Sequence, residues 1–326
     1  MSPIHVPLRL RLAIGGLSAF FAFIAAETGV RALDGNAFPN LAIFAMEGGT
    51  ITLRVSACQS LRRPDGLVYP VCTDTTGART HGDWLIVGDS QVLGLGVRGE
   101  DTFAARLGAT GYGVPGYGVV DTLAAADRLV RAHLPTGLVL VLNQANDWDE
   151  GERPIEARYA VRGGWLVNRD HADGPGAWFW ASPFSNSHLL VQAFRRLSPA
   201  PDLAGTAGLA PATAVHGVTV AFAARIEAFS AAHPDLRTLV AFLPADAATS
   251  EARAAVSPLT WSGRPWADAA LRDDLAAALG PIPLVDLVEP LRDPAGFLDG
   301  DFHLSEAGHA RVAEALRRPM GLTAAP

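Results

Sequence analysis

The chain contains no lysine, because all 26 basic residues among its 326 are arginine. This absence excludes Schiff-base chemistry and a lysine general base. The net charge is −7 and no basic stripe with interleaved aromatic residues occurs, which argues against a nucleic-acid partner. Two cysteines without a neighbouring histidine cluster do not make a zinc site, so neither a metal nor another cofactor is expected. Without repeats or heptads, a chain that is 49% hydrophobic is expected to be globular, with one substantial core.

A charge-free apolar segment lies close to the N-terminus. Arg9 and Arg11 precede it, no charge occurs over residues 12–26, and Glu27 follows. A basic flank and an apolar run of this length are typical of an export signal. The pattern of small residues that marks a cleavage site is poor, which favours an uncleaved signal anchor over residues 1–35. The sequence thus predicts that the rest of the chain lies outside the cytoplasm, whereas a buried core helix is the alternative.

The two cysteines fall in a segment rich in proline and glycine. Cys58 and Cys72 lie 14 residues apart, and outside the reducing cytoplasm such a pair is expected to form a disulfide. Apolar runs at 41–45 and 51–55 flank Glu47-Gly48-Gly49, which is typical of a hairpin. Residues 36–80 are therefore predicted to form a short exported extension closed by a disulfide, followed by a main domain over 81–326.

From residue 84 on, strand-like and helix-like patterns alternate. Buried-strand patterns occur at 84–88, 138–142, 239–243 and 283–287, and helical patterns occur at 121–133, 218–233, 267–279 and 305–317. This alternation predicts an α/β fold in which helices cover both faces of a parallel sheet. Two insertions interrupt it, a predicted β-hairpin at 158–167 and a predicted loop rich in alanine, proline and glycine at 198–217.

The first of these strands runs directly into Gly88-Asp89-Ser90. Ligands of open α/β sheets bind at the carboxyl ends of the strands. Ser90 is therefore a candidate nucleophile, and the alternative is that it only caps the following helix.

Three further segments carry groups that suit a serine nucleophile. Gly116 lies in a glycine-rich turn that is expected to follow a further strand between 88 and 138, and Asn146 follows the predicted strand at 138–142, so both can supply N–H donors to an oxyanion. Near the C-terminus, Asp299 and Asp301 precede His303. An acid beside a histidine fixes its tautomer and stabilises the imidazolium, as a base that serves a serine requires.

In this order, Gly88-Asp89-Ser90, Gly116, Asn146-Asp147 and the loop that ends at His303 resemble the motifs of the SGNH/GDSL hydrolase superfamily. The resemblance covers about residues 83–318, and the N-terminal segment resembles the anchor of the membrane-tethered bacterial branch. It implies a flavodoxin-like three-layer α/β/α fold, with Ser90 as nucleophile and His303 as base. It also implies an oxyanion hole formed by the Ser90 N–H, the Gly116 N–H and the Asn146 side chain.

The chain departs from the family pattern at two places that matter. Gln144 stands where the third motif usually has glycine, and Gly300 stands where the acid usually precedes the histidine by three residues. Asp301 is predicted to be the acid because of its shorter spacing to His303, and Asp299 is the alternative.

These features predict a serine-dependent ester hydrolase in the bacterial cell envelope, anchored in the membrane with its catalytic domain on the periplasmic or extracellular side. Trp148 beside Asn146 favours a carbohydrate ester as substrate, since aromatic rings suit sugar rings. One alternative is an O-acyltransferase that receives its acyl group from a membrane-bound O-acyltransferase partner. The other is a catalytically degenerate binding module. His309, six residues beyond His303, is predicted to be a packing residue rather than a second base.

Overall fold

A five-stranded parallel sheet forms the centre of the computed structural model, which describes residues 7–38, 40–63, 65–150, 152–169, 177–197, 212–249 and 270–323. Its strands are β5 (Trp84–Gly88), β6 (Thr110–Gly113), β7 (Gly137–Asn143), β10 (Arg237–Leu243) and β11 (Leu284–Asp286). Their order is β11-β10-β7-β5-β6, and every neighbouring pair is parallel. This is the flavodoxin-like order, in which the chain reverses its winding direction between β5 and β7. The predicted fold class is therefore confirmed.

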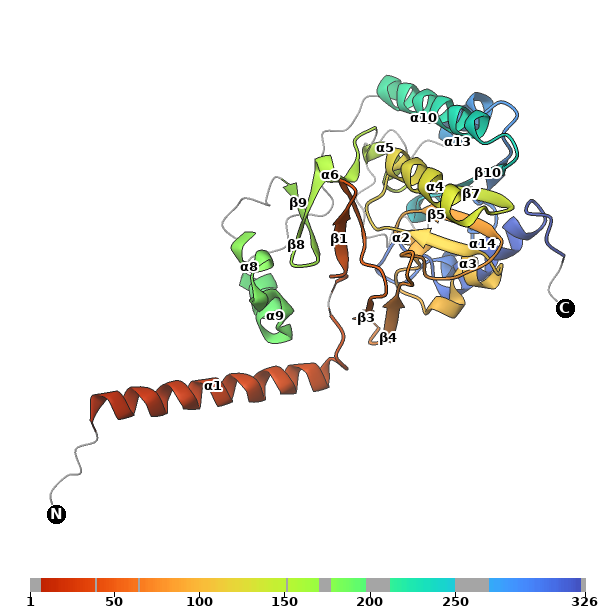
Figure 1. Cartoon of the computed structure of the whole chain (residues 1–326). Helices are drawn as coiled ribbons and strands as arrows, with labels where there is room; N and C mark the ends of the chain where they lie inside the picture. The colour runs from red at the N-terminus through yellow and green to blue at the C-terminus, as the bar shows by residue number, and fades with distance from the viewer. Residues whose placement is uncertain are drawn as a thin grey trace, which may run out of the picture.

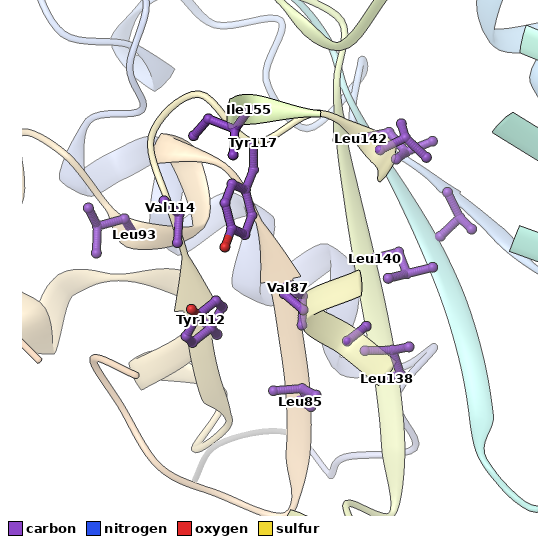
Figure 2. Close-up of a cluster of buried hydrophobic side chains, with 14 of the residues drawn as sticks. Leu85, Val87, Leu93, Tyr112, Val114, Tyr117, Leu138, Leu140, Leu142 and Ile155 are labelled. Carbon is purple, nitrogen blue, oxygen red and sulfur yellow. The ribbon is translucent and has the colours of Figure 1, made fainter. Parts of the chain in front are cut away.

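Helices cover both faces of the sheet, because successive side chains of each buried strand point to opposite faces. Leu85 and Val87 of β5 pack into one buried cluster with α4 (Val119–His133), α10 (Ala212–Ala232) and α13 (Ala270–Ala278). Figure 2 shows the β5 and β7 side chains of this cluster. Ile86 points the other way, into a second cluster with α3 (Phe103–Arg106) and α14 (Glu306–Arg317). The three-layer arrangement thus follows from strands that are apolar on both faces (Figure 1).

The extension before the sheet consists of two antiparallel hairpins. Strands β1 (Phe44–Glu47) and β2 (Thr50–Leu53) form the first, and β3 (Cys58–Arg62) and β4 (Val68–Cys72) form the second. The predicted disulfide joins Cys58 to Cys72, which lie directly opposite each other in the second hairpin. Closing a loop of this size contributes about 3 kcal/mol in the chain-entropy model. Ile51, Leu53 and Val71 belong to the same buried cluster as Leu85, so the extension completes the core of the sheet.

An N-terminal helix, α1 (Leu8–Leu33), has no buried residue and is exposed except at Glu27, Val30 and Arg31 near its end, which are half-buried. It is long and apolar enough to cross a membrane. In the described part of the chain none of its residues is buried, so α1 is not the buried core helix that was the alternative to an anchor. Its length and exposure are what a membrane anchor requires.

A smaller unit lies between the sheet and α1. The hairpin of β8 (Tyr159–Arg162) and β9 (Trp165–Asn168) confirms the predicted hairpin at 158–167. It is followed by α8 (Ala177–Ala181), the 3-10 helix η2 (Pro183–Asn186) and α9 (His188–Leu197). Trp165, Phe179 and Val191 are at the centre of a third buried cluster that joins these elements.

The predicted loop at 198–217 is partly wrong. Residues 198–211 lie outside the described residues, but 212–217 form the first turns of α10. The segment was expected to be a loop because it has few large apolar residues, yet alanine has the highest helix propensity of all residues. The remaining short helices connect the sheet strands and are α2 (Ser90–Leu93), η1 (Gly99–Asp101), α5 (Asp147–Glu150), α6 (Ile155–Arg158), α11 (Asp246–Thr249) and η4 (Pro294–Gly296).

Candidate active site

Ser90 is the first residue of α2, directly after β5. Asp89 caps this short helix, since its carboxylate accepts a hydrogen bond of 2.9 Å from the Gln91 N–H. The end of β6 approaches α2 so closely that a Cβ at Gly113 would lie 2.2 Å from the backbone nitrogen of Leu93. We expected the glycines of this segment to let the backbone approach a ligand. Gly113 instead lets β6 pack against the helix that carries Ser90.

The structure brings Ser90, His303 and Asp301 together. The Ser90 Oγ lies 3.0 Å from the His303 Nε2, and the Asp301 Oδ1 lies 2.7 Å from the His303 Nδ1. Asp301, and not Asp299, therefore holds the side of the imidazole that faces away from the serine. Asp299 is exposed. Gly300 adopts a left-handed conformation with φ +66°, which lets the chain turn tightly between the two acids.

The electrostatics of the histidine and its acid depend on each other. Burial raises the pKa of Asp301, but the charge of His303 and hydrogen bonds from its ring, its N–H and the Phe302 N–H together lower that pKa to about 2. For His303 the signs are reversed. Burial lowers its pKa, but the charge and hydrogen bond of Asp301, with smaller contributions from Asp89 and Asp246, raise it above the ordinary value of 6.5. The pair is therefore arranged to stabilise an imidazolium.

A glutamine next to the nucleophile fixes the histidine loop. The Gln91 side chain is buried, its Nε2 donates to the Phe302 carbonyl at 3.1 Å, and its Oε1 accepts from the Leu304 N–H at 3.0 Å. These are the backbone groups on either side of His303, so one amide holds the base against the nucleophile. The sequence analysis missed this role of Gln91. No local pattern signals it, because both partners lie more than 200 positions away in the sequence.

Beneath the serine, Asp89 is completely buried and lies among amides. Asn143 Nδ2 donates to its carboxylate at 2.8 Å, and the Asn146 side chain is also hydrogen-bonded to it. Burial raises the pKa of Asp89, while the hydrogen bonds from Asn143, Gln91 and Asn146 and the charge of His303 act in the opposite direction. The Asn146 Oδ1 is buried and has no hydrogen-bond partner in the part of the chain that is described. The two amides thus link the end of β7 to the turn that carries Ser90.

Gly116 lies in the loop after β6, at the same sheet edge as Ser90. It has a φ of +86°, a conformation that favours glycine. Its carbonyl accepts a hydrogen bond of 2.6 Å from the buried guanidinium of Arg158, which also pairs with Asp121 at 3.2 Å. The hydrogen bond at the Gly116 carbonyl therefore holds the loop, and the Gly116 N–H takes no part in this hydrogen bond.

Trp148 is not placed to hold a sugar ring, contrary to what its position beside Asn146 suggested. Its side chain is only 3% exposed, packs against Phe222 and Phe242, and donates from Nε1 to the Thr219 Oγ1 at 2.9 Å. The end of β7 turns into α5 and directs this tryptophan into the core. The argument from Trp148 for a carbohydrate substrate is therefore wrong.

His309 is a buried side chain of α14, stacked on Phe103. Its Nδ1 accepts a hydrogen bond from the Phe103 N–H at 3.2 Å, and burial lowers its pKa to about 3. A neutral, buried histidine thus packs α14 against α3. The described residues include no group of three or more His, Cys, Asp or Glu side chains that could hold a metal ion.

The fold and the site together define a doubly wound α/β protein with a hydrogen-bonded Ser-His-Asp arrangement at the carboxyl edge of its sheet. Such an arrangement suits a serine that attacks a carbonyl group, with the histidine as proton acceptor.

Comparison with protein-family models finds no match, and comparison with curated protein sequences finds none either. Among solved structures, the chain is similar to a catalytic mutant of an acetylxylan esterase from Geobacillus stearothermophilus, with 14% identity, a TM-score of 0.39, and coverage of 75% of this chain and 96% of that one. A GDSL-like lipase from Bacteroides thetaiotaomicron shows 12% identity and a TM-score of 0.38, over 73% of this chain and 87% of that one. A psychrotrophic esterase from Pseudoalteromonas sp. shows 9% identity and a TM-score of 0.39, over 73% and 96%. At this level of similarity, an assignment of function has to rest on the site itself.

Proposed function

We propose that the protein is a serine-dependent ester hydrolase of the SGNH/GDSL type that acts outside the cytoplasm. The observation that carries the proposal is the continuous chain of hydrogen bonds from Ser90 through His303 to Asp301, at 3.0 and 2.7 Å. A serine hydroxyl is a weak nucleophile until an adjacent base removes its proton, and this geometry supplies that base.

In the proposed mechanism, the Ser90 Oγ attacks the ester carbonyl while the His303 Nε2 takes its proton. The Asp301 carboxylate holds the Nδ1–H tautomer and stabilises the imidazolium that forms. The imidazolium then protonates the leaving alcohol, and an acyl group remains on Ser90. Water attacks this acyl-enzyme with the help of His303 and restores the free serine.

The Ser90 N–H, the Gly116 N–H and the Asn146 amide are the proposed donors to the oxyanion of the tetrahedral intermediate. An amide NH₂ carries two N–H bonds, so Asn146 can donate one to Asp89 and the other to the substrate. The hydrogen bond to Asp89 would then orient the Asn146 amide before the substrate arrives. A donor that is already oriented needs no reorganisation when the oxyanion forms.

Replacing this donor tests the oxyanion assignment. We expect Asn146→Ala to lower kcat for p-nitrophenyl acetate by roughly 10²-fold with a smaller change in KM, because the donor acts on charge that develops in the transition state. Steady-state kinetics on the full-length protein in detergent micelles provide the measurement. A control is Asn168→Ala in β9, outside the site, which should leave kcat unchanged. Wild-type kcat in Asn146→Ala would remove Asn146 from the proposed oxyanion hole.

The proposed location is the bacterial cell envelope, with α1 in the membrane and the catalytic domain on the periplasmic or extracellular side. The exposed apolar surface of α1 and the disulfide between Cys58 and Cys72 support this location. An enzyme tethered there meets acylated components of the envelope, so an acyl or acetyl ester of an envelope carbohydrate is the proposed substrate. Transfer to a carbohydrate hydroxyl, with a membrane-bound O-acyltransferase as donor partner, is the second candidate, favoured by the anchor.

Labelling with a fluorophosphonate separates an enzyme of either kind from a binding module. We expect the probe to modify Ser90 and to leave the other serines unmodified, because only Ser90 has a histidine base at hydrogen-bond distance among the described residues. Peptide mass spectrometry of the labelled full-length protein identifies the site. Heat-denatured protein is the control and should not react. An unlabelled Ser90 in the folded protein would favour the binding module. In a separate assay with an added oligosaccharide, release of acetate without transfer to the oligosaccharide would favour hydrolysis over acyl transfer.

A further inference from the structure

Two exposed aromatic side chains stand out on the surface of the unit formed by α8, η2 and α9, which is called the α8–α9 unit (residues 177–197) below. Trp178 is 62% exposed and Phe184 is 55% exposed, and in the described ranges no other aromatic residue outside α1 is exposed to this extent. The rest of the unit is well packed. Phe179 is buried and stacks on Phe194 with ring centroids 4.2 Å apart. The two exposed rings are therefore not the result of a loosely built segment.

The carboxylate of Glu27, near the end of α1, accepts hydrogen bonds from the start of α9 in the α8–α9 unit. Glu27 accepts hydrogen bonds from the His188 N–H at 3.0 Å and the Leu189 N–H at 2.9 Å, and from the Ser187 hydroxyl at 2.8 Å. These are the donors at the N-terminus of α9, where a negative charge is favourable. The same carboxylate accepts from the Arg31 Nε at 2.6 Å, so the half-buried Glu27 is also paired with a positive charge.

Further contacts extend the attachment along α1. The Arg31 guanidinium donates to the Asn186 carbonyl at 2.9 Å, and the Gln192 side chain hydrogen-bonds to Asp34. Figure 1 shows α9 beside the last turns of α1, with α8 farther from α1 and the parallel sheet beyond the end of α1. The α8–α9 unit is therefore attached at Glu27, where the apolar part of α1 ends, and at the residues that follow it up to Asp34.

The position of Glu27 on α1 indicates where the α8–α9 unit, with Trp178 and Phe184, lies relative to a membrane. Glu27 is the first charged residue after the charge-free run at 12–26, so it marks the outer end of the apolar part of the helix. A run of this length extends about 22 Å at 1.5 Å per residue, less than the roughly 30 Å of a bilayer's hydrocarbon core. A helix that spans with so short a run draws Glu27 to the membrane boundary, where its charge is stabilised by the α9 N–H groups and by Arg31.

From these observations we infer that the α8–α9 unit rests on the outer surface of a phospholipid bilayer, with Trp178 and Phe184 in the headgroup region. Tryptophan favours this region because its ring is amphipathic, and phenylalanine adds buried apolar area where a segment lies on the membrane surface. The unit is attached through the third buried cluster to the β8–β9 hairpin, whose Val161 and Leu166 pack against the core of the sheet, and it is attached to α1 through Glu27. It therefore acts as a foot that sets the orientation of Ser90 relative to the membrane. The inference rests on the proposed anchoring of α1.

Spin labels at single introduced cysteines test the inference on the full-length protein in vesicles of phosphatidylcholine and phosphatidylglycerol. Because Cys58 and Cys72 are joined in a disulfide, only the introduced cysteine reacts under non-reducing conditions. The variants are Trp178→Cys and Phe184→Cys on the foot, Met46→Cys as an exposed control on β1, and Leu17→Cys within α1. At 178 and 184 we expect collisions with a water-soluble nickel chelate to be several-fold fewer than at 46, and collisions with oxygen to be more frequent.

The four positions separate the inference from the proposals on which it rests. Nickel access at 178 and 184 equal to that at 46, with Leu17→Cys shielded, would overturn the foot and leave the anchor intact. Nickel access at 17 as well would overturn the anchor and the inference together. Fluorophosphonate labelling of Ser90 in the same vesicles reports independently on the proposed ester chemistry.

Discussion

Ser90→Ala is expected to abolish turnover of a short-chain aryl ester such as p-nitrophenyl acetate, with a loss in kcat of about 10⁶-fold, the size found when a protease loses its nucleophilic serine. The reason is that the His303 Nε2, at 3.0 Å from the Ser90 Oγ, would have no proton to remove and no acyl-enzyme could form. The measurement is kcat of the full-length variant in micelles. Ser230→Ala in α10, outside the site, is the matched control and should retain wild-type turnover.

Folding of the serine variant has to be shown independently, since loss of activity can also follow from unfolding. Ser90 occupies the first turn of a four-residue helix and its side chain caps no other group, so alanine is expected to leave the fold intact. Circular dichroism and the mass of the intact disulfide provide the check. A folded Ser90→Ala protein with wild-type kcat would show that Ser90 is not the nucleophile.

Asp301→Asn is expected to lower turnover by roughly 10⁴-fold, because a histidine without its carboxylate adopts the wrong tautomer and loses the partner of its imidazolium. Asp299→Asn is the matched control and is expected to behave like a surface substitution, since Asp299 is exposed and Asp301 is the acid that contacts His303 at 2.7 Å. Loss of activity in Asp299→Asn alone would transfer the role to Asp299. Wild-type activity in both variants and in the double variant would indicate a Ser-His dyad.

The pH dependence provides a second readout for the same pair. His303 must be neutral to act as base, and its pKa is raised above 6.5 mainly by the charge and hydrogen bond of Asp301, against the effect of burial. The wild-type kcat/KM should therefore rise with pH through an inflection above 6.5. Removing the carboxylate charge should move the residual inflection of Asp301→Asn to lower pH, whereas Asp299→Asn should keep the wild-type inflection. An unchanged inflection in Asp301→Asn would mean that another group raises the pKa of His303.

The sheet and the triad-like order of residues could be predicted from the sequence because their signals are local. Strands β5, β7 and β10 are built on continuous apolar runs, and Asp89-Ser90 directly follows β5, whereas β6 has no such run. Parallel strands carry their carboxyl ends to one edge, which places Ser90, Gly116 and Asn146 there before any distance is known. The pairing of Cys58 with Cys72 was also predictable, because only two cysteines occur.

Contacts between distant segments could not be predicted in this way. Gln91 bonds to backbone groups of Phe302 and Leu304, and backbone groups leave no trace in side-chain patterns. Trp148 follows directly after Asn146-Asp147, but whether its side chain points to the site or to the core depends on how α5 leaves the sheet. The helical start of α10 was missed because a segment rich in alanine without large apolar residues reads equally well as loop or helix.

The two hydrogen bonds from Gln91 to the histidine loop determine when the site can form during synthesis. Ser90 and His303 are 213 positions apart, and both backbone partners of Gln91 are synthesised more than 200 residues after it. Until the segment with these partners has folded onto the sheet, Ser90 has neither a base nor the loop that presents one. A growing chain is therefore expected to carry an ordinary serine until the segment around His303 has been made and has folded onto the sheet.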